Sequence, residues 1–244
     1  MNLTGIKNNT LPLIAIVLSL SWWVYLFFST QMLIAMDALG YEHLGRLIQQ
    51  KGWENYFIAG PNREPFYPWF ISISMTMAAF WNTSYIPIQK IFQIIVFCFS
   101  QLLLFKLLLE FKIRPAVSGL ILIYFGFSPA LVNSVFSLYS EIVTYPFILG
   151  IIMISFAMLK DLPKAHWPKV RLKCVYLTLM FLCITFTKGI FEYICPVFLV
   201  CLLIIASVTC VRNRREIAPL LISFFFIFVF CVSLNSAERF LNKK

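Results

Sequence analysis

MDALGYEHLGRLIQQKGWENYFIAGPNREPFYPW, residues 36–69, is the polar segment that follows the first long apolar run of the chain. It carries four of the ten acidic residues and opens with Asp37, one of only two aspartates among 244 residues. An ionised carboxylate at the edge of a membrane span is costly unless partners or a function hold it there. Asp37 is therefore the first candidate functional residue.

The composition around this segment predicts an integral membrane protein. The chain is 61% hydrophobic and 12% charged, so it has more apolar residues than a soluble domain of this size can bury. Its apolar runs reach the roughly 20 residues that a membrane helix needs, and they lack the alternation of a β-barrel. We therefore expect an all-α polytopic membrane protein. The net charge of +10 lies mostly in short clusters between apolar runs, which indicates topology signals and no nucleic-acid partner.

Eight apolar segments are candidates for membrane helices. The second is doubtful because it opens with Pro65 and Pro68. The first is longer than the core of a signal peptide, so we expect it to be retained as a span. The segments are Leu11–Ala35, Glu64–Trp81, Ile86–Leu109, Val117–Leu138, Ile142–Leu159, Cys174–Thr187, Ile190–Val211 and Ile217–Leu234.

The placement of charge decides whether Glu64–Trp81 crosses. Cytoplasmic loops carry an excess of Lys and Arg. If this segment does not cross, twelve of the twenty basic residues, including every dense cluster, lie on the cytoplasmic side. If it crosses, eleven of those twelve face outward. The sequence thus predicts seven crossings, with the N-terminus inside and the C-terminus outside.

This topology places the unusual polar residues on one outer face. Residues 36–86 and Tyr139–Glu141 lie there, with Lys188 and Glu192 at a nearby helix junction. We expect a single transmembrane domain over residues 1–244, in which residues 36–85 form an outer-face loop with juxtamembrane helices.

The first juxtamembrane helix is predicted over Asp37–Gln50, with Gly52 ending it. It is amphipathic, so we expect it to lie in the membrane interface. The second is the non-crossing apolar element Glu64–Trp81. The predicted apolar face of the first helix consists of Leu39, Leu44, Leu47 and Ile48.

Four short motifs occur in a fixed order between Leu11 and Val211. They are Asp37-Ala38-Leu39-Gly40-Tyr41, then Arg63-Glu64-Pro65-Phe66-Tyr67-Pro68, then Pro129 followed by Ser140-Glu141, then Thr187-Lys188 followed by Pro196. Their order and shared sidedness resemble the membrane glycosyltransferases of the GT-C fold, such as the relatives of protein mannosyltransferases and of lipid A aminoarabinose transferases. The resemblance implies transfer of a sugar from a polyprenyl-phosphate carrier to an acceptor or membrane lipid. It also implies a bacterial inner membrane, with the active site facing the periplasm.

The resemblance implies roles for particular residues. Asp37 is the catalytic base that takes the proton of the acceptor hydroxyl. Glu141 is a second catalytic residue that positions the acceptor, shares a divalent metal with Asp37, or acts as another acid or base. Arg63 and Lys188 neutralise the phosphate of the leaving carrier. The remaining substrate-binding candidates are Glu64, Tyr41 and His43.

The chain departs from the pattern in two ways. Glu64 stands where some relatives have a basic residue directly before the proline. Enzymes of this fold also run to about twice this length, so we expect a truncated or split enzyme, or one that relies on a partner subunit for the C-terminal half.

Simpler interpretations remain open. Asp37 and Glu141 are also suited to cap helices, and Lys188 to extend its amine to the membrane surface. Two other functions compete with the transferase. One is a transporter or flippase for a polar lipid, and the other is a membrane subunit without catalysis.

Overall fold

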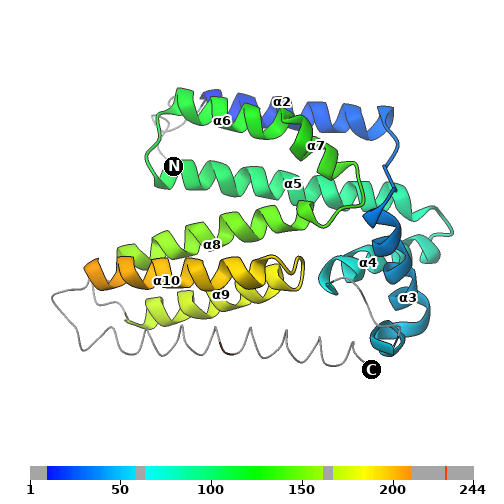
Figure 1. The fold of residues 1–244 in the computed structure, drawn as a ribbon. Helices are drawn as coiled ribbons and strands as arrows, with labels where there is room; N and C mark the ends of the chain where they lie inside the picture. The colour runs from blue at the N-terminus through cyan, green and yellow to red at the C-terminus, as the bar shows by residue number, and fades with distance from the viewer. Residues whose placement is uncertain (1–9, 59–63, 162–166, 210–228, 230–244) are drawn as a thin grey trace. The chain divides into compact units, whose positions relative to one another are not determined.

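The structure, a computed structural model, describes residues 10–58, 64–161, 167–209 and 229, and these are almost entirely α-helical (Figure 1). No named strand occurs in these ranges, so the all-α prediction is confirmed there. The helices are α2 (Thr10–Ser29), α3 (Asp37–Ile58), α4 (Phe66–Phe80), α5 (Tyr85–Glu110), α6 (Pro115–Phe127), α7 (Pro129–Val135), α8 (Glu141–Asp161), α9 (Trp167–Thr185) and α10 (Phe191–Thr209).

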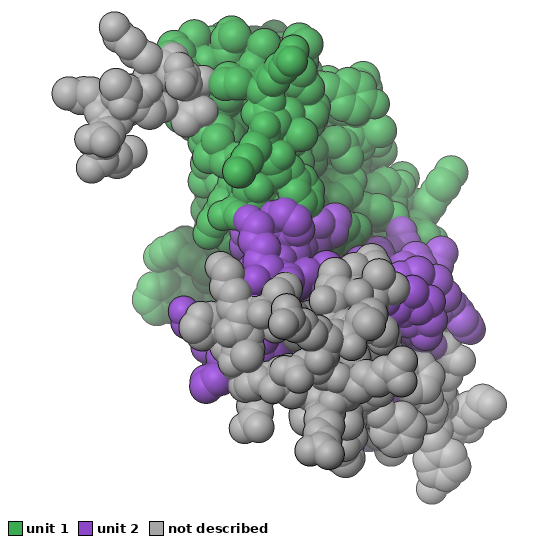
Figure 2. Space-filling view, turned by 90° about the vertical axis from the view of Figure 1, so that its left-hand side faces the viewer, with its two compact units in different colours: residues 1–50, 67–149 green, residues 51–66, 150–244 purple. Residues whose placement is uncertain are grey.

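The described helices form two compact units, coloured separately in Figure 2. Unit 1 comprises Met1–Gln50 and Tyr67–Leu149, and unit 2 comprises Lys51–Phe66 and Gly150–Lys244. The expected single transmembrane domain stays a prediction.

Three of the described helices, α2, α5 and α8, are long and apolar enough to cross a membrane. Only 22% of the most apolar stretch of α2 is buried, so most of its hydrophobic side chains face outward. Such an apolar surface is stable in lipid and unfavourable in water. The helices therefore fit a membrane protein and match three of the predicted spans, although α2 ends at Ser29 and not at Ala35.

The described helices do not by themselves give the predicted seven crossings. Helix α9 begins at Trp167, seven residues before the predicted span, and so includes Lys169, Arg171 and Lys173. The apolar stretch Phe191–Leu202 of α10 is shorter than a span. The last candidate, residues 217–234, lies outside the described residues except for position 229.

The predicted span Val117–Leu138 is not one straight helix, because the chain bends by 51° between α6 and α7. Pro129 has no N–H to donate, and it disfavours a helical conformation at the preceding residue. Ser128 accordingly has φ −57° and ψ 121°. The pair counts as a fourth crossing only if both helices form one broken span.

Helices α2 and α6 of unit 1 run parallel and touch along their length. A Cβ atom added to Gly119 would lie 3.3 Å from Leu11 Cβ, and one added to Gly126 would lie 1.9 Å from Ser19 Oγ. The indole Nε1 of Trp23 donates to Gly126 O at 2.8 Å. Glycine at position 126 therefore allows the two backbones to approach, as small residues do between membrane helices.

Helix α5 runs antiparallel to α2 in the same unit. Gln101, late in α5, donates to Ser19 Oγ at 2.9 Å, whereas Lys90, early in α5, reaches Phe27 O near the end of α2. Helix α5 therefore starts at the same end of unit 1 at which α2 ends. This agrees with the prediction that the intervening apolar element does not cross. Helix α4, with 15 residues, is about 22 Å long and shorter than the hydrocarbon layer.

The first juxtamembrane helix is observed at its predicted position, and the face that it buries within unit 1 differs from the predicted apolar face. Gly52 has φ 79° and interrupts α3 where the first helix was expected to end. Leu39 is 56% exposed, so it lies outside the face that packs on the rest of unit 1. The buried residues of this first segment are Ala38, Tyr41, Leu44, Gly45 and Ile48. The buried face includes Gly45 because α3 packs on α4 at this position, where an added Cβ would lie 3.0 Å from Ile71 Cγ2.

In unit 2, the second half of α8 forms an antiparallel hairpin with α9. Lys173 Nζ donates to Asp161 Oδ2 at 2.6 Å and to Ala157 O at 2.8 Å. The thiol of Cys174 lies 3.8 Å from the sulfur of Met158. Helix α10 packs on α9 through the rings of Phe181 and Phe198.

We predict that Gly126→Ala destabilises the protein by about 1–3 kcal/mol, because the new methyl overlaps Ser19. The measurement is unfolding of the detergent-solubilised protein. Gly40→Ala is the matched control, since an added Cβ there meets nothing within 4 Å, and alanine favours a helix by up to about 1 kcal/mol. Equal effects of the two substitutions would contradict the close packing of α2 and α6.

Candidate functional site

Asp37 and Glu141 occupy equivalent places in unit 1. Each is the first residue of a helix, α3 or α8. Four residues before each acid, Leu33 and Ser137 form an isolated parallel β-bridge. The Leu33 N–H donates to Phe136 O at 2.8 Å, and the Leu138 N–H donates to Leu33 O at 3.1 Å. The two linkers that lead to the acids are therefore held side by side.

A second contact joins the starts of the two helices. Tyr41, one turn after Asp37, shares a 3.1 Å hydrogen bond with the hydroxyl of Ser140, directly before Glu141. Both side chains are buried. The structure thus brings Asp37 and Glu141 to the same region of unit 1, as the sequence predicted for their shared face.

The backbone before Asp37 has an uncommon conformation. Met36 has φ 52°, in the left-handed region, and is 86% exposed. The Leu39 N–H donates to Met36 O and the Ala38 N–H to Ala35 O, so a tight turn redirects the chain into α3. This turn leaves Asp37 exposed at the helix start. A carboxylate there is stabilised by the helix dipole, so the capping role is compatible with a catalytic one.

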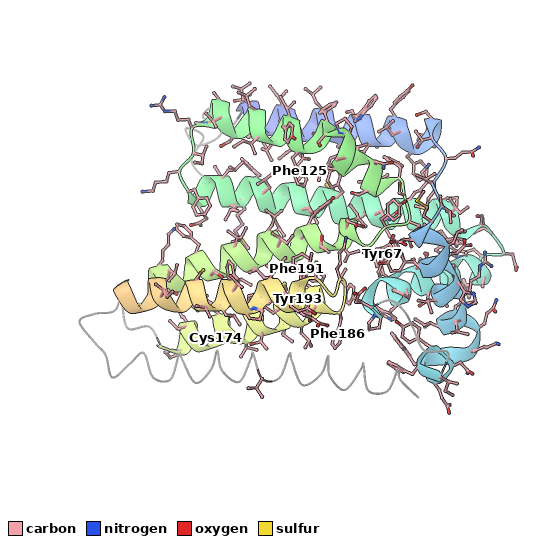
Figure 3. All side chains as sticks on the ribbon, in the orientation of Figure 1. Tyr67, Phe125, Cys174, Phe186, Phe191 and Tyr193 are labelled. Carbon is pink, nitrogen blue, oxygen red and sulfur yellow. The ribbon has the colours of Figure 1, made fainter. Side chains whose placement is uncertain are left out.

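A buried polar network lies behind the two acids. Tyr67, labelled in Figure 3, packs edge-on against Tyr41, with ring centroids 5.0 Å apart. Gln93 Nε2 donates both to Tyr67 Oη and to Ser137 O, each at 2.9 Å. Burial raises the pKa of Tyr67 well above its usual range, and the neighbouring Tyr41 and Glu141 side chains further disfavour its ionised form. Its phenol is therefore neutral and acts as a fixed hydrogen-bonding group.

Lys90 ties α5 to the end of α2. Its Nζ donates to Phe27 O at 2.6 Å and to Thr30 O at 2.8 Å. The ammonium also lies 4.9 Å from the centroid of Phe27 and 5.4 Å from that of Phe136. A cation suits both the negative end of a helix and the faces of aromatic rings.

In unit 2, Glu64 lies beside the turn that contains Lys188. Glu64 Oε1 accepts the N–H of Gly189 at 2.5 Å. The next contact follows two residues later, where the Phe66 N–H donates to Phe186 O at 3.0 Å. The structure thus places Glu64, a predicted substrate-binding residue, against the residue that follows Lys188, a predicted phosphate ligand. Arg63 lies outside the described residues.

The other predicted substrate-binding residues differ in exposure. His43 is exposed on α3 and Tyr41 is 5% exposed. The buried Tyr41 hydroxyl therefore links the start of α3 to the start of α8 through Ser140. His43 points away from the buried face of its helix.

The sequence analysis missed the polar turn Gln89-Lys90 and Gln93 of α5. These side chains are at most 5% exposed, although they lie in a predicted span. The available signal was three polar residues within five positions of an apolar segment. Such residues in a membrane helix usually face the protein interior and are functional candidates.

Few side chains that could bind a divalent metal lie close together in the described part of the chain. Among the described residues, no group of three or more His, Cys, Asp or Glu side chains is placed to hold an ion. Mg²⁺ is commonly bound by one or two carboxylates together with the phosphates of a substrate. A divalent metal shared by Asp37 and Glu141 therefore stays a prediction, and the proposed steps do not use one.

The fold and these contacts define an α-helical membrane protein in which two acids begin neighbouring helix segments. No family model, curated protein or solved structure matches the chain.

We predict that Tyr41→Phe and Ser140→Ala are energetically coupled by about 0.5–1.5 kcal/mol, the net value of one buried hydrogen bond. A double-mutant cycle on unfolding in detergent measures the coupling. A coupling near zero would mean that this hydrogen bond does not join α3 to α8.

Proposed function

We propose that the chain is a membrane glycosyltransferase of the GT-C type, which moves a sugar from a polyprenyl-phosphate carrier to an acceptor at the outer membrane face. The observation that carries the proposal is the pairing of the Asp37 and Glu141 linkers through the Leu33–Ser137 bridge. The proposal includes seven crossings and an orientation with both acids outside, as the charge distribution favours.

Asp37 is the base in this proposal. The acceptor oxygen attacks the anomeric carbon as the bond from that carbon to the carrier phosphate breaks. The acceptor proton passes to the Asp37 carboxylate, and the phosphate leaves with the bonding electrons. Asp37 suits this role because it is exposed and reachable by an acceptor.

Glu141 is assigned to the acceptor. It is partly buried at the start of α8, and the helix start is fixed by the Tyr41–Ser140 hydrogen bond. A carboxylate held in one place can accept hydrogen bonds from acceptor hydroxyls and orient one of them toward the base. Of the three roles open to Glu141, positioning needs the fewest additional groups.

Cations must offset the charge that grows on the leaving phosphate. Arg63 and Lys188 take this role on the basis of the family resemblance and their chemistry. The contact between Glu64 and Gly189 supports the proposal in one respect, since it holds the segment directly after Arg63 against the Lys188 turn within unit 2.

A polar-lipid transporter is the second candidate, because the break between α6 and α7 is a feature of transporter folds. Transporter sites lie near the bilayer midplane. Lys90, in contrast, bonds carbonyls at the end of α2, and it is the sixth residue of α5. The charge of Lys90 thus lies near the end of a predicted span and not near its middle, which favours the transferase over the transporter.

The test uses the full chain in lipid nanodiscs with a panel of polyprenyl-phosphate sugars, and it measures release of free polyprenyl phosphate. We expect Asp37→Asn to lower the rate by about 100-fold or more, the typical contribution of general base catalysis. Glu110→Gln, the same change of charge at the far end of α5, is the control and should keep the wild-type rate.

Two results would contradict the proposal. One is no release from any donor, with or without divalent cations. The other is an unchanged rate in Asp37→Asn. If vesicles containing the protein move a labelled carrier sugar between leaflets while no transfer occurs, the transporter interpretation replaces the enzyme.

A further inference from the structure

Each acid is preceded by a non-helical linker that needs support from other parts of unit 1. Residues 30–36 separate α2 from α3, and residues 136–140 separate α7 from α8. Helix packing fixes the helices, but a linker lacks the internal hydrogen bonds of a helix. The side chains that bond these linkers therefore determine where the acids lie.

Two side chains on one turn of α5 bond the two linkers that precede the acids. Lys90 donates to Phe27 O and Thr30 O, where the Asp37 linker begins. Gln93 donates to Ser137 O, in the middle of the Glu141 linker. Residues three apart lie on the same side of a helix, so both side chains leave α5 in similar directions. The β-bridge between Leu33 and Ser137 closes the arrangement.

We propose that Lys90 and Gln93 are positioning residues, which together fix the placement of Asp37 relative to Glu141. The role assigned to the two acids rests on the proposed function, whereas the placement itself does not. Neither residue touches substrate in this scheme. They act on the acids through the backbone oxygens of Phe27, Thr30 and Ser137.

The chemistry of the two side chains favours positioning over simple packing. Both are nearly inaccessible, at 5% exposed for Lys90 and 0% for Gln93. The Gln93 Oε1 atom is buried without a hydrogen-bond partner, as is Gln89 Nε2. An unsatisfied buried polar atom lowers the stability of the folded protein. A purely apolar turn would avoid this cost but could not bond either linker.

The experiment measures the separation of the two acid-bearing turns in the full chain without substrate. Spin-labelled non-canonical amino acids replace Met36, directly before Asp37, and Tyr139, two residues before Glu141, and the seven cysteines stay in place. Electron-spin distance measurements then give the distribution of separations. We expect one narrow population with wild-type residues at positions 90 and 93.

We expect Lys90→Met and Gln93→Leu each to abolish that narrow population, because a linker loses its bond to α5. Gln101→Leu is the matched control. Gln101 is also buried in α5, but its partners are Ser19 and Leu122, within helices. It should keep the narrow distribution. If Lys90→Met does not fold, Gln93→Leu carries the test, with its melting temperature as the check on folding.

A narrow distribution in both folded variants would overturn the inference, as would equal broadening in Gln101→Leu. The outcome is independent of catalysis because no substrate is present. Where wild-type transfer is observed, the same variants should lose about 100-fold in rate, since small misplacements of reacting groups have effects of that size. Broadening without any transfer by the wild type would retain the positioning role and reject the proposed enzyme.

Discussion

The contact of Gly126 with Ser19 sets the distance between α2 and α6, and the acid-bearing end of unit 1 depends on that distance. Helix α2 leads directly into the Asp37 linker, and α6 leads into the Glu141 linker through the short helix α7. Leu33 and Ser137 pair in a β-bridge, and four residues after each of them a helix begins with an acid. A larger residue at Gly126 would separate the helices and, with them, the two linkers.

Apolar surroundings impose a second requirement on this end of the protein. The last carbonyls of α2 have no partner within their own helix, and unsatisfied carbonyls are costly in lipid. Lys90 satisfies one of these acceptors, Phe27 O, and also the carbonyl of Thr30 directly after the helix, and its own charge is stabilised by the helix end and two aromatic rings. Gln93 does the same for Ser137 O. The polar residues of α5 and the backbone groups they bond thus stabilise each other.

Much of the architecture followed from hydropathy and backbone chemistry. The long spans α5 and α8 were predicted closely, as was the interruption of α3 at Gly52, because glycine reaches positive φ without strain. The charge distribution also gave the correct end of unit 1 for the start of α5. The sidedness relative to a membrane, the number of crossings beyond the described helices and the chemical function stay predictions.

Other features depended on contacts that a linear pattern does not contain. Val117–Leu138 looked like one apolar span, and only the missing N–H of Pro129 argued for a break. The apolar face of α3 was assigned from hydrophobic residues alone, whereas the helix docks through Tyr41 and Gly45. Lys90 and Gln93 were read as part of a span, since the linker oxygens that they bond are backbone atoms more than 40 positions away.

The bond from Lys90 to α2 also has a consequence for biogenesis. A lysine entering a membrane helix carries an insertion cost of up to about 2.5–3.5 kcal/mol at the bilayer centre, and less near the ends. In the folded structure, Phe27 O and Thr30 O accept hydrogen bonds from Lys90 and offset this cost. Because α2 precedes α5 in the chain, these acceptors are synthesised before the lysine that needs them.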